Sequence, residues 1–168
     1  MKIDTNGLIR RLILEQRHAT EQETAQIIAH VAQQPVSSFP RKINLWLREE
    51  LDMRGVQAPT GKLSSVQIHL FKRIYYDGQW SPNTTIAQFE ADLHKAVQHP
   101  AVALWTYRWL GEHFAGFLAP SHVNNVPHPQ EFIFVAYVAD YGTIKTGFQT
   151  SGVDTIFTDE FEGLVRHR

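Results

Sequence analysis

The spacing of the apolar residues changes once along the chain, near Pro100, and this change limits the folds that the chain can adopt. Before Pro100, apolar side chains recur every three or four residues, which is the period of an amphipathic helix. After it, they form short alternating or continuous runs separated by turn residues, as strands do. The pattern predicts an α+β protein, with N-terminal helices followed by a roughly four-stranded antiparallel sheet packed on helices.

The segments nearest the N-terminus are predicted to be helical. Residues 5–17 place their apolar side chains on one helix face. A second helix over residues 20–31 begins with a capping box, in which the Thr20 hydroxyl and a glutamate three residues later each satisfy a free backbone amide. Residues 36–62 fit a strand or a helix, and a helix that ends at Gly55 is favoured.

Two more helices are predicted before Pro100. Residues 64–76 place apolar side chains on one arc of a helix and basic side chains on the other, with Ser64 or Ser65 as the cap. Residues 86–98 follow a second capping box and carry another apolar stripe. Pro100 ends this helix, because proline lacks the amide hydrogen that a helix interior needs.

The second half of the chain is predicted to form a sheet. The expected strands are residues 101–107, 113–118, 132–138 and 143–150, with a possible short strand at Ile156 and Phe157. The third strand is almost wholly apolar, as expected for a central strand that is covered on both faces. The turn residues at positions 140–142 join it to the fourth strand as a hairpin.

The loop at residues 57–62 is the best candidate for a domain boundary. We therefore predict a helical N-terminal extension over residues 1–60 and an α+β domain over residues 61–168. The extension is compatible with a neutralising segment or a dimer surface, and simple packing on the core is favoured over both.

Charge and composition exclude several classes of protein. The chain has 16 Lys and Arg against 17 Asp and Glu, a net charge of −1, whereas non-specific DNA binders are usually strongly basic. It has no cysteine, which excludes disulfides, cysteine nucleophiles and cysteine zinc sites. Residues 1–4 lack the apolar run of a signal peptide, and no stretch approaches the roughly 18 apolar residues of a membrane span. We expect a soluble, cytoplasmic protein that makes no membrane contact.

Two groups of polar residues are candidates for chemistry. His69, Lys72 and Arg73 are spaced i, i+3 and i+4 on one face of the predicted helix, and the hairpin of residues 135–149 carries the second group. An imidazole titrates near neutral pH, so it suits the transfer of a proton to or from a ribose hydroxyl. Lysine and arginine stabilise the charge that develops on a phosphate in the transition state.

The order of these elements resembles the Barnase–EndoU–colicin–RelE group of small nuclease folds, which occurs in many bacterial toxin and phage-associated domains. In that group a helix with histidine and basic residues precedes a second helix and a sheet, and a late strand has the form Gly-x-Ile-x-Thr-Gly/Ala-aromatic. Residues 142–148 match that form, with Phe148 where the group usually has tyrosine. Residues 79–93 also resemble a recurring bacterial family of unassigned function. The resemblance covers roughly residues 63–158.

The resemblance implies a metal-independent, ribonuclease-like hydrolase of the toxin type that cleaves RNA by acid/base transphosphorylation without a cofactor. RNA would be its substrate, and an antitoxin, an immunity protein or a second copy of the chain its partner. The implied catalytic residues are His69, Arg73, Thr146 and Gln149, and the implied substrate-binding residues are Lys72, Lys145, Gln79 and Trp80. The alternative is a non-catalytic interaction module with the same fold that binds a protein or RNA.

Each assignment has a simpler alternative. The basic helix face is compatible with a solvated surface, the polar strand residues with ordinary sheet residues, and Gln79 and Trp80 with a loop anchored on the core. On a regular strand Thr146 and Gln149 face opposite sides. They can act together only if the strand bends or bulges, which Gly147 permits.

Other histidines are weaker candidates. Arg108 and His113 have the Arg-x4-His spacing of the all-helical HEPN ribonucleases, but their surroundings are predicted to be strands. Two histidine pairs lack a third metal ligand at standard spacing, so surface histidines are the default reading for His94 with His99 and for His122 with His128.

Overall fold

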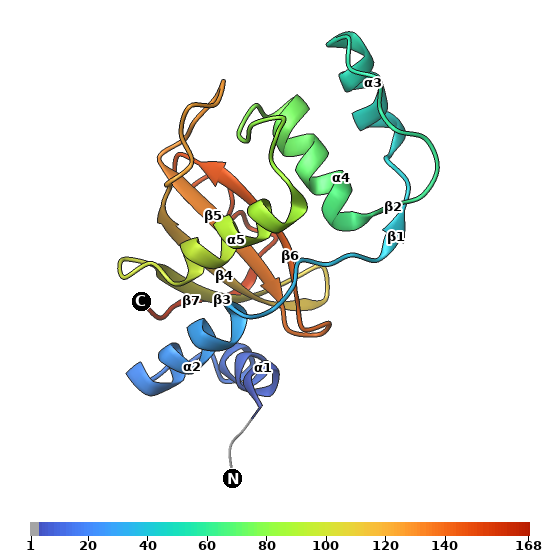
Figure 1. Ribbon diagram of the computed structural model, residues 1–168. Helices are drawn as coiled ribbons and strands as arrows, with labels where there is room; N and C mark the ends of the chain where they lie inside the picture. Colours follow the sequence, from blue (N-terminus) through green and yellow to red (C-terminus); the bar gives the residue numbers. More distant parts are fainter. Residues whose placement is uncertain (1–3) are drawn as a thin grey trace.

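The computed structural model describes residues 4–168, in which helices cover one face of an antiparallel sheet (Figure 1). The sheet has five strands in the order β6-β5-β4-β3-β7. They are β3 (Ala103–Trp109), β4 (Glu112–Pro120), β5 (Phe132–Val138), β6 (Thr143–Thr150) and β7 (Glu162–Arg166). The α+β prediction is confirmed. The expectation that residues 1–4 carry no signal-peptide run rests mostly on residues 1–3, which lie outside the described residues.

The predicted count of four strands is wrong, because β7 pairs with β3 as a fifth strand at the sheet edge. The short strand expected at Ile156 and Phe157 does not form. Ile156 lies in a turn, Phe157 follows it outside any regular element, and both side chains pack against the sheet. The fifth strand was missed because Leu164 and Val165 are its only apolar residues. Such a short segment is selected by its partner strand rather than by its own pattern.

Within residues 4–168, five α-helices precede the five-stranded sheet. They are α1 (Thr5–Glu15), α2 (Glu21–Val31), α3 (Leu45–Met53), α4 (Ser65–Phe71) and α5 (Ile86–Val97). The capping boxes at Thr20 and Thr85 form as predicted, and a third one caps α4. The helix expected over residues 64–76 forms, but its second half was not predicted to change type. There α4 widens into a π-helical turn, η1 (Lys72–Tyr76), whose extra residue rotates the following side chains.

The helix favoured within residues 36–62 forms as α3, but the small two-stranded ribbon around it was not predicted. The strands β1 (Pro40–Arg41) and β2 (Leu63–Ser64) form a two-stranded antiparallel ribbon at the two ends of the segment that contains α3. Leu47 and Leu51 of α3 pack in a separate small cluster with Ile68 of α4. Consequently α3 lies farther from the sheet than α5 does (Figure 1).

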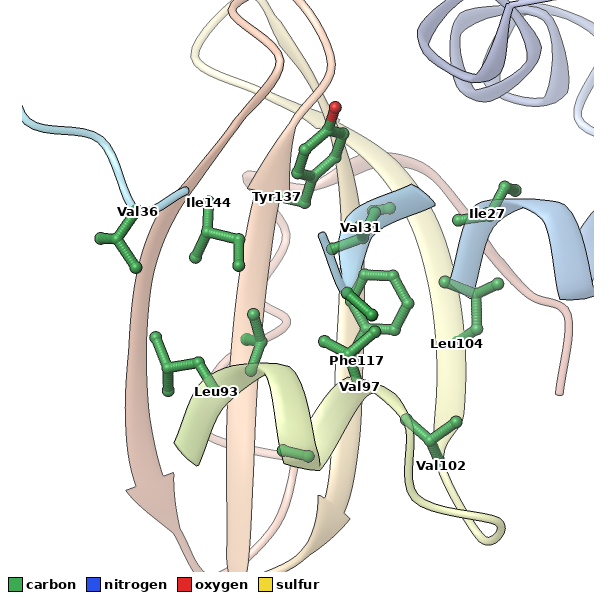
Figure 2. Packing of buried hydrophobic residues seen from close by; sticks show 14 of the residues in the cluster. Ile27, Val31, Val36, Leu93, Val97, Val102, Leu104, Phe117, Tyr137 and Ile144 are labelled. Carbon is green, nitrogen blue, oxygen red and sulfur yellow. The ribbon is translucent and has the colours of Figure 1, made fainter. Parts of the chain in front are cut away.

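The main core lies between the sheet and the helices. Leu8 and Leu12 of α1 belong to the same buried cluster as Phe117 of β4, so the N-terminal helices and the sheet share one core. Figure 2 shows Leu93 and Val97 of α5 lying against the sheet in this cluster. The predicted domain boundary near residue 60 stays a prediction. Within residues 4–168 no helix is both long and apolar enough to cross a membrane.

The opposite face of the sheet carries an aromatic layer. Tyr107, Phe114 and Phe134 are buried there, and the segment after β6 folds back over them with Phe157 and Phe161. The rings of Tyr107 and Phe157 meet edge to face, with their centroids 5.2 Å apart. The strand β6 contributes the polar residues Lys145 and Thr146 to the border of this layer.

Candidate active site

The strand β6 contains a β-bulge at Lys145. Ala136 of β5 is opposite Thr146, while the next residue, Tyr137, is opposite Ile144, so Lys145 is an extra residue on β6. The bulge directs Lys145 and Thr146 toward the same aromatic face of the sheet. A bend or bulge, which Gly147 permits, was the condition for Thr146 and Gln149 to act together. The bulge lies at Lys145 instead, and the side chains of Thr146 and Gln149 bond different partners.

Gly147 leaves the space that the helix α5 occupies. A Cβ atom at this position would lie 2.3 Å from Leu93 Cδ2, so glycine is required because α5 packs directly on the backbone of β6. The helix therefore passes over β6 at the residue that follows Thr146.

The structure brings three of the predicted catalytic residues together. Thr146 Oγ1 lies 3.3 Å from His69 Nδ1 and accepts a hydrogen bond of 3.1 Å from an Nη of Arg73. His69 and Arg73 come from α4 and η1, more than 70 positions before Thr146 in the chain. The basic helix face and the hairpin of residues 135–149 are therefore in contact.

Arg73 is nevertheless buried and holds the edge strand. Its Nε donates to the Gly147 carbonyl at 2.9 Å, and its other Nη forms a 2.8 Å ion pair with Asp77. Burial lowers the pKa of Arg73, and the Asp77 carboxylate opposes that change. These bonds satisfy a free carbonyl at the edge of the sheet and leave the guanidinium little access to a phosphate.

Gln79 and Gln149 form a second connection to the same edge. The Gln79 side chain accepts from the backbone amide of Gln149 at 2.8 Å and donates to its carbonyl at 2.9 Å, as a neighbouring strand would. The buried Gln149 side chain in turn donates to the Gln79 carbonyl and accepts from Ser121. Gln149 does not come near Thr146 through its side chain, so this pair holds the fold together.

The side chains of Trp80 and Lys72, two predicted substrate-binding residues, also contact other side chains of the protein. The indole of buried Trp80 donates to Asp92 at 2.9 Å, and His122 shares that carboxylate. The Lys72 ammonium lies 5.7 Å from the centroid of the Trp46 ring on α3. Burial lowers the pKa of Lys72, and the neighbouring guanidinium of η1 adds to the effect.

The environment of His69 keeps its imidazole neutral. Burial, together with the positive charges of Arg73, Arg41, Lys72 and Lys145, lowers the pKa of His69 to about 3, and burial is the largest cause. At neutral pH this imidazole can accept a proton at Nδ1 but has none to release as an acid. The acid part of the predicted acid/base role is therefore unfavourable.

Two cavities meet at Lys145. The aromatic cavity, of about 470 Å³, is lined by several rings, including Trp109, Phe134 and Phe148, and by Lys145 and Thr146. The outer cavity, of about 660 Å³, lies on the other side of Lys145 and is lined by polar and aromatic residues that include Phe39, Glu112 and Tyr141. His69 and Arg73 line neither of these two cavities, whereas Thr146 lines the aromatic one.

Glu112 and Tyr141 were missed at the sequence level. The Lys145 ammonium lies 3.6 Å from the Glu112 carboxylate, and a hydrogen bond to that carboxylate raises the pKa of the exposed Tyr141 phenol. No local motif marks either residue. Their proximity to Lys145 depends on the register of β4, β5 and β6, which only the folded sheet defines.

No protein-family model, curated protein or solved structure matches this chain. The resemblance to the Barnase–EndoU–colicin–RelE group therefore stays a prediction. Across the described residues, no three His, Asp or Glu side chains gather closely enough to hold a metal ion.

Proposed function

We propose that this protein is a metal-independent, ribonuclease-like domain whose reactive groups are Thr146, His69 and Lys145. The observation that supports this most directly is the 3.3 Å contact between Thr146 Oγ1 and His69 Nδ1, beside a cavity that Thr146 itself lines. Arg73 donates to the same hydroxyl oxygen, which leaves the hydroxyl hydrogen free to point at the imidazole.

The reaction would be an internal transphosphorylation. The ribose 2′-oxygen bonds to phosphorus while its proton passes to Thr146 Oγ1 and the Thr146 proton passes to His69 Nδ1. The bond from phosphorus to the 5′-oxygen breaks, and Lys145 stabilises the phosphorane and gives the leaving oxygen a proton. The products are a 2′,3′-cyclic phosphate and a free 5′-hydroxyl, and proton transfer from His69 through water restores Lys145.

The low pKa of His69 makes it a weak base, and RNA would strengthen it. Four cations contribute to the depression of this pKa, and a phosphodiester anion beside them offsets that contribution. Burial lowers the pKa of His69 more than any one of these cations does, and bound RNA would not remove that contribution. The consequence is slow cleavage that persists in mild acid, because the imidazole stays neutral well below pH 6.5.

The test is cleavage of an end-labelled single-stranded RNA in EDTA. We expect a cyclic-phosphate product, a loss of about 100-fold or more in Thr146→Val, which removes a proton-transfer group, and a similar loss in Lys145→Gln. Lys95→Gln, an exposed change on α5, is the matched control and should cleave like the wild type. Absence of cleavage by the wild type, or full activity of a folded Thr146→Val variant, would overturn the proposal.

A second candidate function is a non-catalytic module of the same fold that binds RNA or a protein. Arg73 and Gln79 favour it, because both use their polar groups to satisfy the edge of β6. RNA binding by the wild type without cleavage, measured by fluorescence anisotropy in the same buffer, is the result expected for this module.

A further inference from the structure

We propose that residues 151–161, which join β6 to β7, form a lid over the aromatic face of the sheet, and that the closed lid inhibits the candidate site. The lid itself goes beyond the proposed function, and only the inhibition rests on that function. Thr155 and Glu160 of the lid form one wall of the aromatic cavity, and Lys145 and Thr146 of the sheet belong to the facing wall. Movement of the lid therefore changes the space in front of Thr146.

The lid is attached to the sheet by the packing of side chains. Throughout residues 4–168, the hydrogen bonds that involve residues 153–161 join members of this segment to one another, as the Phe157 amide does when it donates to the Val153 carbonyl. The neighbouring strands, in contrast, are joined by ladders of backbone bonds. Opening the lid breaks few bonds to the rest of the protein, so it requires less free energy than unfolding the sheet.

Two aromatic side chains keep the lid closed. The Phe157 ring meets the Tyr107 ring edge to face, with centroids 5.2 Å apart. The Phe161 ring stacks on the indole of Trp109, with centroids 5.4 Å apart and planes 7° from parallel. The core between the sheet and the helices lies on the other face. Truncation of Phe157 should therefore favour the open lid and leave that core intact.

The indole N–H of Trp109 favours the open lid. Its Nε1 is buried and, among the side chains of residues 4–168, is the buried polar atom that lacks a hydrogen-bond partner. An unsatisfied buried donor costs free energy, which is recovered when water reaches it. Because Phe161 lies flat on this indole, opening of the lid uncovers one face of the ring and gives water a path to Nε1. The closed lid is thus less stable than its packing alone would make it.

The charge of the lid opposes RNA at the candidate site. The lid carries the carboxylates of Asp154, Asp159 and Glu160 and no lysine or arginine. Glu160 lines the same cavity as Lys145 and Thr146, so it repels a phosphodiester placed at Thr146. Opening of the lid moves this carboxylate away and widens the cavity. The closed lid therefore inhibits the site by charge and by space.

Hydrogen exchange of the indole N–H groups, followed by NMR in D2O at several urea concentrations, measures the opening, and Trp109→Phe assigns the relevant signal. We expect the Trp109 proton to exchange at least about 10-fold faster than that of Trp80, which is buried and bonded to Asp92. Its rate should also depend less on urea, because opening the lid exposes less surface than global unfolding does.

Two truncations separate the lid from the core. Phe157→Ala should accelerate Trp109 exchange by about 10-fold or more, because the lost ring contacts stabilise the closed lid. Val97→Ala, the matched control on α5 in the other core, should leave Trp109 exchange unchanged and accelerate that of Trp80. Exchange of both indoles at the same rate and with the same urea dependence, or no effect of Phe157→Ala on Trp109, would overturn the lid.

Fluorescence anisotropy with a 2′-O-methyl single-stranded RNA, which cannot undergo transphosphorylation, tests the inhibition. Phe157→Ala and Glu160→Gln should each tighten binding by about 5-fold or more. Asp159→Asn, an exposed lid change outside the cavity wall, is the matched control and should change it by less than about 2-fold. Unchanged or weaker binding in the first two variants would refute the inhibition. If neither the wild type nor the variants bind RNA, the proposed function and the inhibition both fail, and the exchange rates still decide whether the lid exists.

Discussion

Replacing Gly147 with alanine should destabilise the protein, because the added methyl group has no space under α5. The new Cβ would lie 2.3 and 2.8 Å from the two Cδ atoms of Leu93, which is fully buried. Gly147 does not adopt a positive φ, so the backbone accepts alanine and the cost is steric. Overpacking of this kind costs about 1–3 kcal/mol, equivalent to about 2–4 °C in Tm for each kcal/mol in a chain of this size.

A double-mutant cycle identifies Leu93 as the cause. Leu93→Ala alone should cost about 2–5 kcal/mol, because it leaves a cavity in the core. In the double variant the smaller side chain accommodates the methyl group of Ala at position 147. The combined loss should therefore fall short of the sum by about 0.5–3 kcal/mol. Urea denaturation monitored by circular dichroism measures each free energy of unfolding.

Gly152 provides the matched control, since a Cβ there meets no atom within 4 Å and its φ is not positive. Gly152→Ala should change stability by less than about 0.5 kcal/mol. Equal effects at Gly147 and Gly152, or strictly additive losses in the cycle, would refute the packing argument.

Two further predictions concern the buried charges. Because the pKa of His69 is about 3 in the folded protein and about 6.5 in the unfolded chain, the unfolded chain binds more protons and stability should fall as the pH drops from 6.5 toward 3. His69→Gln should flatten this dependence between pH 7 and 5 in urea titrations, and an unchanged slope would contradict it. Arg73→Met should cost about 3–5 kcal/mol by leaving the partly buried Asp77 carboxylate without its partner. Adding Asp77→Asn should recover part of that loss, and a loss below 1 kcal/mol in the single variant would show that the edge of β6 needs no arginine.

The folded structure gives Arg73 and Gln79 roles that differ from those predicted from the sequence. Arg73 and Gln79 looked like substrate ligands because their types suit phosphate and base contacts. In the fold, β6 is an edge strand whose free backbone groups must be satisfied, and these two side chains satisfy them. No sequence pattern shows which strand will be an edge.

The sequence by itself determined the features that depend on neighbouring residues: the capping boxes at Thr20 and Thr85, the end of α5 before Pro100, and the hairpin between β5 and β6. Their free energies come from bonds and dihedral preferences within a few residues. Only the tertiary structure decided the pairing of β7, the bulge at Lys145, and the positions of Glu112 and Tyr141 around that lysine. These depend on the register of strands and on which surfaces are buried, and many distant residues contribute to both.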